Sequence, residues 1–354
     1  MRVSGKTERP GIMRLESIQK PWHKADMKQQ TGQSGHLFNR RHLLTGAGLG
    51  VLGAALETSP GRVLGEDVQK SPVASAGQFR MCLNMSTIRG QDLNPAEEIE
   101  IAGKAGYESI EPWFRKINPY LESGGSLKDL KKRIDDHGLT VESAIGFAPW
   151  IVNDADKRAG GFEEARRDMD TIAQLGGKRI AAPPAGVGKN EVVSLDDAAD
   201  RYRKLLELGD QMGITPQVEM WGGNPTIGTI EKALYVAIRS GHPRACFLGD
   251  VYHIYKGESS FDSLLLLGPH AIQHFHMNDY PADPPRATIN DSFRVFPGDG
   301  IAPLTRMLKN FKAVGAYPSL SLELFNRSYW KMPALECARV GLEKMRDTVA
   351  KAEA

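Results

Sequence analysis

Short apolar runs alternate with longer segments of helical periodicity from residue 79 to the end of the chain. In the runs, side chains fall on two alternating faces, as in a strand; in the longer segments, apolar residues recur every three or four positions, as in a helix. The predicted strands cover residues 79–86, 107–113, 139–147, 178–185, 214–221, 245–253, 271–279 and 318–325. The predicted helices cover residues 94–106, 126–138, 162–177, 195–213, 229–241, 261–269, 301–315 and roughly 333–352.

The first predicted helix has clear start and stop signals. Asn94 is a good N-cap, Pro95 suits the first helical position, and Glu97 places an acid in the first turn. Gly106 is a typical residue at which a helix ends. These signals indicate that the apolar pattern marks real element boundaries.

Alternation of strand and helix predicts an α/β fold, and eight strands predict a single-domain (β/α)8 TIM barrel over residues 78–352. A barrel of this kind typically needs about 250 residues. An open doubly wound sheet is the competing architecture, but it normally carries a glycine-rich turn after its first strand, and residues 83–94 contain none. In the last strand Leu320, Leu322 and Leu324 share one face, whereas Ser321 and Glu323 share the other, which suits helices outside and polar groups inside.

Composition excludes several classes of protein. The 354 residues carry a net charge of +2, which gives no electrostatic basis for binding nucleic acid. Cys82, Cys246 and Cys337 are odd in number and widely spaced, which argues against disulfides and thiolate metal sites. No run reaches the roughly 18 apolar residues of a spanning helix.

Residues 1–77 are predicted to be a disordered leader with an export signal. Arg40 and Arg41 precede the weakly apolar, glycine-rich residues 46–56, which resembles a twin-arginine signal, although Leu43 stands where phenylalanine is usual. The expected location is therefore the periplasm, reached through the twin-arginine export machinery. A basic tail beside a small buried helix is the alternative. Met27 is a candidate start, and the cleavage site is left open.

Four residues at the ends of successive apolar runs have the chemistry of metal ligands. The run ends carry Glu219, Asp250, His276 and Glu323. Parallel strands bring such ends to one edge of a sheet, and three carboxylates with one neutral histidine suit a single divalent ion such as Mn2+, Mg2+, Co2+ or Zn2+. The alternative for each residue alone is an ion pair or a packed histidine.

In this order, the segments VEMW, GDVYH, HFHMND, FPGDG and LEL resemble the xylose isomerase-like barrel superfamily of sugar (phosphate) isomerases and epimerases. That superfamily includes hydroxypyruvate isomerase, ketose 3-epimerases and inosose dehydratase. The resemblance covers roughly residues 79–350 and implies that the four residues above bind one metal. It also implies that His253 and Arg294 contact the substrate, with Arg286 as the rival arginine. His274, two residues before a ligand, is expected to support it.

A metal flanked by two glutamates suits proton transfer beside a carbonyl through an enediolate. Glu219 and Glu323 are the candidate bases, although a bound cation weakens a carboxylate as a base. Trp113 and Trp221 are expected to pack on the substrate. Similar contacts are weighed for Phe147, Trp150 and Tyr252 against simple core packing, and Glu111 is left open between hydrogen bonding and catalysis.

These features predict a metal-dependent isomerase or epimerase of a sugar or keto-sugar. A dehydratase acting on a keto-sugar or keto-inositol is the first alternative, and a non-catalytic sugar-binding barrel is the second. The related apurinic endonucleases need extra histidines at the ends of the second and third strands, where this chain has residues 111–113 and 147–150. Without an evident phosphate cradle, an unphosphorylated substrate is expected. Metal identity and oligomeric state, including a homo-oligomer, stay open.

Overall fold

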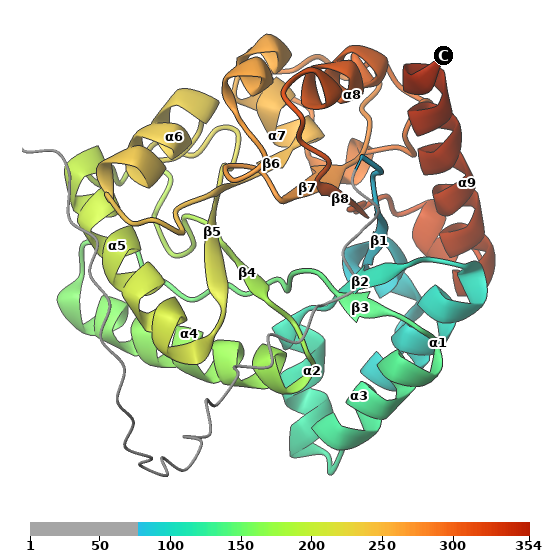
Figure 1. Cartoon of the computed structure of the whole chain (residues 1–354), viewed down its shortest axis with the longest axis horizontal. Coiled ribbons are helices and arrows are strands. Elements are labelled where there is room, and N and C mark those ends of the chain that lie inside the picture. The colour runs from blue at the N-terminus through green and yellow to red at the C-terminus, as the bar shows by residue number, and fades with distance from the viewer. Residues whose placement is uncertain (1–76) are drawn as a thin grey trace, which may run out of the picture. The chain divides into compact units, whose positions relative to one another are not determined.

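The computed structural model describes residues 77–354, so the predicted arginine pair and the apolar stretch of the leader lie outside the described residues. Within the described part, eight parallel strands are surrounded by helices, which confirms the predicted TIM barrel (Figure 1). The strands are β1 Met81–Asn84, β2 Ser109–Glu111, β3 Thr140–Val141, β4 Arg179–Ala182, β5 Thr215–Glu219, β6 Phe247–Asp250, β7 His274–Met277 and β8 Ser319–Leu322.

The strands follow one another in chain order around the sheet, and β1 lies beside β8. Between β3 and β4 the ladder is reduced to a single contact, in which the Ala181 amide donates to the Ala144 carbonyl at 2.9 Å. Pro183 and Pro184 follow β4 and cannot donate to a ladder, so pairing ends there. The barrel is therefore closed most weakly at this seam.

The helices form the outer layer. They are α1 Pro95–Ala105, α2 Phe114–Glu122, α3 Leu127–Asp136, α4 Ala155–Gln174, α5 Leu195–Met212, α6 Ile230–Arg239, α7 Val251–Lys256, α8 Leu304–Ala313 and α9 Ala334–Glu353. Four 3-10 segments join them: η1 Met85–Gln91, η2 Phe261–Leu266, η3 Asp291–Phe293 and η4 Tyr329–Lys331. None of the helices in the described part is long and apolar enough to cross a membrane.

The predicted boundaries of α1 are confirmed in detail. The Asn94 side chain accepts from the Ala96 and Glu97 amides, and the Glu97 carboxylate accepts from the Asn94 amide, so both partners of a capping box are in place. Gly106 ends the helix at φ +92°, a conformation that is strained for residues with a side chain. Local sequence therefore determines where this helix starts and stops.

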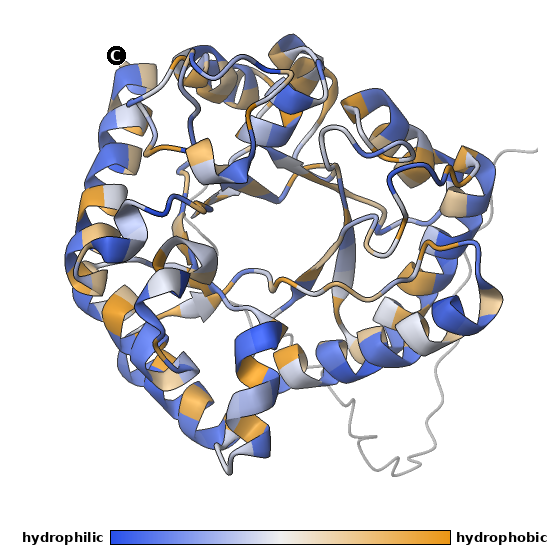
Figure 2. Ribbon diagram, turned by 180° about the vertical axis from the view of Figure 1, so that it is seen from behind, coloured by the Kyte–Doolittle hydropathy of each residue, from blue (hydrophilic) through white to orange (hydrophobic). Residues whose placement is uncertain are grey.

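The alternation predicted for the last strand also holds. Leu320, Leu322 and Leu324 are fully buried in the core between strands and helices, whereas Ser321 and Glu323 face the barrel interior. Along the outer helices hydrophilic and hydrophobic residues alternate, as amphipathic helices on a barrel require (Figure 2).

Some predicted elements differ from those observed. Strand β6 ends at Asp250, and α7 begins at Val251 because the Asp250 side chain caps the helix by accepting from the His253 amide at 2.8 Å. His253 therefore lies on a short helix and not on a strand. Helix α2 was not predicted, and residues 261–266 form a 3-10 helix.

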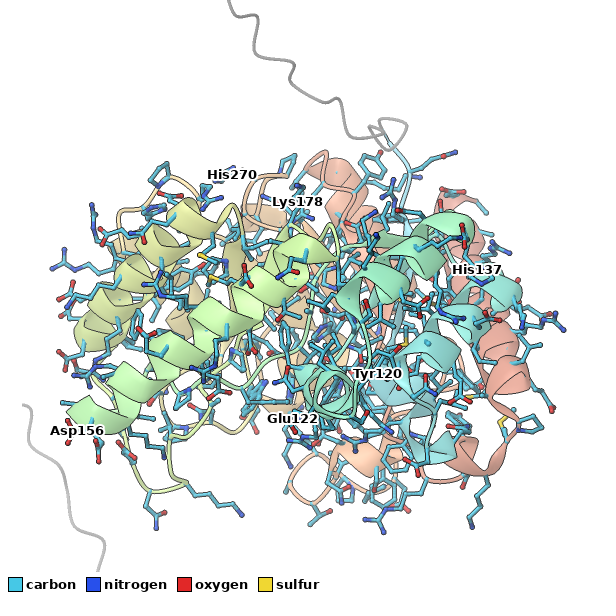
Figure 3. All side chains as sticks on the ribbon, turned by 90° about the horizontal axis from the view of Figure 1, so that it is seen from below. Tyr120, Glu122, His137, Asp156, Lys178 and His270 are labelled. Carbon is cyan, nitrogen blue, oxygen red and sulfur yellow. The ribbon has the colours of Figure 1, made fainter. Side chains whose placement is uncertain are left out.

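The two ends of the barrel carry different side chains. Lys178 and His270, which come just before β4 and β7, lie at the end where the strands begin (Figure 3). The functional site described below lies at the other end, where the strands finish. This is the end at which TIM barrels bind their substrates.

Gly341 marks the place where α9 packs closely on β8. A Cβ at this position would overlap the Leu322 side chain and would press on Phe296 and Tyr107, all of them buried. We expect Gly341→Ala to lower the free energy of unfolding by about 1 to 3 kcal/mol, because the core cannot make room for a methyl group. Chemical denaturation at equilibrium measures this change.

Gly160→Ala in α4 is the matched control. No atom lies within 4 Å of a Cβ built there, and the residue is exposed. Alanine should stabilise this helix by about 0.5 to 1 kcal/mol through its higher helix propensity. Equal effects of the two substitutions would contradict the close packing of α9 on β8.

Candidate metal centre

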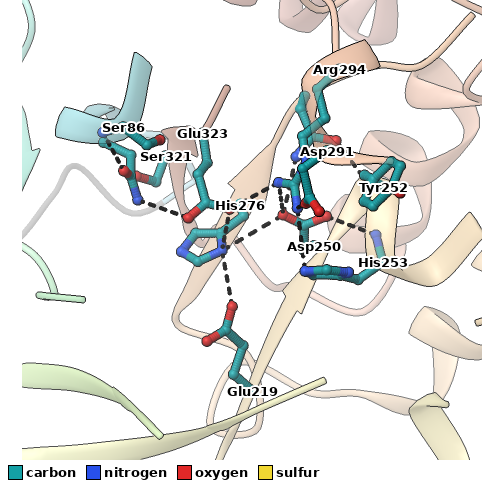
Figure 4. A network of polar contacts seen from close by, with 12 residues as sticks. Ser86, Glu219, Asp250, Tyr252, His253, His276, Asp291, Arg294, Ser321 and Glu323 are labelled. Carbon is teal, nitrogen blue, oxygen red and sulfur yellow. Dashed lines mark hydrogen bonds and ion pairs between the residues drawn. The ribbon is translucent and has the colours of Figure 1, made fainter. Parts of the chain in front are cut away.

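Each of the four predicted ligands stands near the C-terminal end of its own strand. Glu219 and Asp250 are the last residues of β5 and β6, His276 lies in β7, and Glu323 directly follows β8. The parallel register places Asp250 directly beside His276. Glu219 pairs with Leu248 and His276 pairs with Ser321, so the ligands of neighbouring strands are offset by two residues at these two steps. All four candidate ligands are at most 4% exposed, and their polar ends converge (Figure 4).

The separations between their polar atoms suit a shared ion. His276 Nδ1 lies 3.3 Å from Glu323 Oε2, 3.6 Å from Glu219 Oε1 and 3.7 Å from Asp250 Oδ2. Ligands bound about 2.1 Å from an ion in tetrahedral geometry are separated by about 3.4 Å. Moreover, His276 Nδ1 is buried and has no hydrogen-bond partner among the described residues. The ligand atoms of Asp250, His276 and Glu323 lie within 4.8 Å of one another, so these three fit a divalent cation, and Glu219 faces the same imidazole.

Electrostatics at this point also favour a cation. Burial raises the pKa of Glu219 to about 8; His276 opposes this, and the negative charge of Glu323 adds to it. Burial likewise raises the pKa of Glu323 to about 7, although His276 and Arg294 act against it. Burial would also raise the pKa of Asp250, but the Arg294 guanidinium and two histidines bring it down to about 2. A divalent ion bound among these carboxylates would favour their ionised forms and so lower the pKa values of Glu219 and Glu323.

The carboxylate of Glu111 lies next to the imidazole of His276. This glutamate ends β2, and its Oε2 lies 3.1 Å from His276 Nε2, while its Oε1 lies 3.0 Å from His274 Nε2. Metal-binding histidines commonly direct their second ring nitrogen to a carboxylate, which leaves the first nitrogen facing the metal. Of the two roles left open by the sequence, the structure supports hydrogen bonding for Glu111, which accepts from Asn84 and Ser321, and it places His274 and His276 close to the same carboxylate.

Glu111, His274 and His276 form a second group of ligand atoms close enough to hold an ion. These residues are fully buried, however, and Glu111 already accepts from Asn84 Nδ2 at 2.8 Å and from Ser321 Oγ at 2.7 Å. Neither Glu111 nor His274 lines the cavity described below, whereas Glu219 and Glu323 do. The group of Glu219, Asp250, His276 and Glu323 is therefore the better metal site.

Arg294 enters the site between two of the candidate ligands. One of its terminal nitrogens donates to Asp250 Oδ2 and to Glu323 Oε2, both at 2.8 Å. The other donates to Asp291 Oδ1 at 2.6 Å and lies 3.2 Å from His253 Nε2. Its side chain is only 1% exposed but still lines the cavity. The structure thus brings this predicted substrate contact to the ligands.

The rival arginine, Arg286, lies elsewhere. It is exposed, its guanidinium stacks over Tyr255 and it pairs with Glu258 at 3.6 Å. It does not line the cavity. Of the two arginines weighed from the sequence, only Arg294 is placed to meet a substrate.

His253, the other predicted polar contact, also lines the cavity. Burial lowers its pKa to about 4, although Asp250 acts in the opposite direction, so the ring is neutral near pH 7. Because Nε2 faces the Arg294 donor, the proton of the neutral ring belongs on Nδ1, and this atom has no hydrogen-bond partner among the described residues. His253 therefore offers one free donor.

The ligands open into a cavity of about 630 Å³ at the mouth of the barrel. Trp113 and Trp221, both predicted substrate contacts, line it together with Phe147. Trp150 and Tyr252 do not: the Trp150 indole donates to the Pro183 carbonyl, and the Tyr252 hydroxyl donates to the Ile289 carbonyl. These last two aromatic residues serve packing, because their polar atoms are already satisfied.

Three supporting residues were not found from the sequence. Asn84 joins Glu111 to Glu323, Asn278 donates to Asp250 Oδ2 at 3.0 Å, and Asp291 pairs with Arg294. Asn278 shares a strand face with His276, and this pattern was the only available signal for it. Asn84 has no such signal because its partners are distant in sequence. Asp291 lies only three residues before Arg294, but in a segment without strand or helix periodicity.

Comparison with known proteins agrees with the observed fold. Residues 99–348 match the model of the family described as xylose isomerase-like TIM barrel. The chain is 27% identical over 283 residues to an inosose isomerase of Bacillus licheniformis, covering 77% of this chain and 99% of that protein. It is 24% identical over 254 residues to a 3-dehydroshikimate dehydratase of Pseudomonas aeruginosa, covering 70% of this chain and 39% of that protein.

Solved structures show the same likeness. A crystal structure of the IolI protein with a bound zinc atom is 25% identical and superposes with a TM-score of 0.71, covering 77% of this chain and 99% of that one. An L-ribulose 3-epimerase is 18% identical with a TM-score of 0.63, covering 78% and 96%. The observed fold agrees with the family match, which covers most of the described residues. The chain therefore belongs to the xylose isomerase-like TIM barrel family.

Proposed function

We propose that this protein is a divalent-metal-dependent isomerase or epimerase that transfers a proton on a sugar or keto-sugar. The observation that carries the proposal is the convergence of Glu219, Asp250, His276 and Glu323 beneath one cavity, which Glu219 and Glu323 line. Relatives named as an isomerase and an epimerase, and a similar structure with bound zinc, support it. Mn2+, Mg2+, Co2+ and Zn2+ all suit the ligand set.

The residues of the chain divide the work of such a reaction. A divalent ion bound here would polarise a carbonyl and favour negative charge on the neighbouring oxygens. Glu219 and Glu323 flank the cavity floor from β5 and from the end of β8, so one can take a proton from carbon and the other can return it. The Nδ1–H of His253 and the Nε–H of Arg294, which have no partner among the described residues, are the donors left for substrate oxygens.

Loss of water is the second candidate reaction. Proton removal beside a carbonyl also prepares a substrate to expel a hydroxyl group from the adjacent carbon. The relative from Pseudomonas aeruginosa is named as a dehydratase, which favours this alternative over a non-catalytic barrel. Both reactions begin with the same proton removal, so they use the same glutamates.

We further propose that the protein is exported by the twin-arginine pathway. Arg40 and Arg41, followed by residues 46–56, support this proposal. The pathway carries folded proteins, so a metal loaded in the cytoplasm would travel with the barrel.

Metal binding can be measured without a substrate. We expect chelation to lower the melting temperature and Mn2+ or Zn2+ to restore it, by about 5 to 10 °C at a hundredfold excess over the dissociation constant. His276→Gln and Asp250→Asn should remove both this shift and the bound metal measured by elemental analysis. His270→Gln, at the opposite end of the barrel, is the control and should keep both. A full metal complement in His276→Gln would refute the site.

Proton transfer can be detected before the substrate is known. We expect the metal-loaded protein to exchange deuterium from solvent into a carbon beside a carbonyl in at least one member of a keto-sugar panel, followed by NMR. Glu219→Gln and Glu323→Gln should each reduce exchange by about 10²- to 10⁴-fold. Glu343→Gln, exposed on α9, should leave it unchanged. Full exchange in either cavity variant would exclude that glutamate as an essential base. Loss of water from the substrate, measured on the product, separates a lyase from an isomerase.

The export proposal predicts a change in location. In a bacterial host with a twin-arginine translocase, the Arg40→Lys, Arg41→Lys double variant should stay in the cytoplasm, because the translocase recognises paired arginines. Cell fractionation followed by immunoblotting measures the periplasmic share. Arg62→Lys is the matched control and should be exported. Unchanged export of the double variant would rule out this route.

A further inference from the structure

One wall of the cavity carries positive charge. The floor holds the acidic ligands. One wall presents Arg89 from η1, Arg115 from the start of α2 and Arg327 from the loop after β8. Lys189 faces the cavity from the loop after β4. None of these four side chains has an ion-pair or hydrogen-bond partner among residues 77–354. This contrasts with Arg294 on the floor, which has three carboxylate partners.

Arg89 is held in place by aromatic rings and not by acids. Its guanidinium carbon lies 4.9 Å from the ring centre of Trp330, 5.3 Å from that of Phe325 and 5.4 Å from that of Trp113. Stacking of this kind fixes the plane of a guanidinium while its N–H groups stay free to donate at the edge. The side chain is half-buried, so these donors are less hydrated than those of a surface arginine.

A second arginine lies on the same indole. The Arg115 guanidinium is 5.9 Å from the ring centre of Trp113 and 5.2 Å from that of Phe147. Burial lowers the pKa of Arg89, and the nearby charge of Arg115 lowers it further. Glu98, in the adjoining cavity that Arg89 and Arg115 also line, does not neutralise them near pH 7, because burial raises its pKa to about 8. Glu323 acts on Arg89 in the opposite direction, but no carboxylate among the described residues forms an ion pair with either arginine.

Arg89 and Arg115 are linked to the metal centre by side chains that contact one another. Trp113, which carries both guanidinium groups, donates through its indole to Asn84 Oδ1 at 2.7 Å, and Asn84 Nδ2 lies 3.3 Å from Glu323 Oε1. Phe325 follows Glu323 by two residues and contacts Trp113 edge-on at 5.9 Å between ring centres. One molecule lying in the cavity can therefore reach the metal ligands at one end and the arginines at the other.

We infer that the substrate carries an oxyanion, either a carboxylate or a phosphate ester, which Arg89 binds together with Arg115 while the reacting carbonyl lies at the metal centre. A planar guanidinium with free N–H groups matches both kinds of anion through paired hydrogen bonds. The inference rests on the proposed function for the position of the carbonyl. A phosphate ester would differ from the unphosphorylated substrate expected from the sequence, whereas a carboxylate would not. In the first case expectation and inference differ because the arginines come from separate segments and form no local phosphate-binding loop.

The test compares matched neutral and anionic compounds. D-fructose, D-fructose 6-phosphate and D-fructuronate are titrated by calorimetry into the Mn2+-loaded full-length protein, its Arg89→Met and Arg89→Lys variants, and the control Arg166→Met on α4. We expect at least one anion to bind about tenfold or more tightly than D-fructose, with an affinity that falls as salt rises. The tighter of the two anions identifies the group that is recognised.

Arg89→Met should remove this preference, because methionine keeps the packing against the rings but loses the charge. Arg89→Lys should keep part of it, and Arg166→Met should keep all of it. Metal content and melting temperature, measured on each variant, show that the barrel is intact. If Arg89→Met is unfolded, the comparison of Arg89→Lys with the native protein decides, since the ammonium ion lacks the paired N–H geometry.

The outcomes separate this inference from the proposed function. Equal binding of D-fructose and both anions, or an anion preference that survives Arg89→Met, overturns the inference and leaves metal-dependent proton transfer standing. An Arg89-dependent anion preference without deuterium exchange in any compound supports the anion site and contradicts the proposed reaction. Deuterium exchange that is confined to the anionic compounds supports both.

Discussion

Mutual repulsion among buried carboxylates is the constraint around which the mouth of this barrel is organised. Glu219, Asp250 and Glu323 approach one imidazole within 3.3 to 3.7 Å, in a place from which water is largely excluded. Like charges so close together are costly unless a positive charge is shared between them. Arg294 supplies part of that charge, since it pairs with Asp250 and Glu323, and a divalent ion is the natural source of the rest.

The rest of the interior serves to keep these groups in place. Glu111 Oε2 lies 3.1 Å from His276 Nε2, and the other ring nitrogen, Nδ1, faces the carboxylates. Asp250 has two duties, because one of its oxygens caps α7 and the other faces the site. The helix cap thereby positions His253, and a single aspartate couples the local fold at the end of β6 to the chemistry of the cavity.

The cavity is electrically asymmetric. Its floor concentrates negative charge that suits a cation, and one wall presents arginines stacked on Trp113, Phe325 and Trp330. A substrate bound between them would be oriented by its two ends, with polar oxygens at the floor and an anionic group at the wall. This polarity would select among molecules that share a keto-sugar core.

The sequence by itself determined the order of strands and helices, the ends of α1 and the identity of the four candidate ligands, because alternation, capping and residue type act over a few neighbouring positions. Only the tertiary structure decided that Glu111, from β2, would meet His276, from β7, across the barrel, and that Arg89 would lie against Trp330. Such contacts depend on the closure of the barrel and on loop paths, and these are set by packing over the whole domain and leave no periodic trace in the chain.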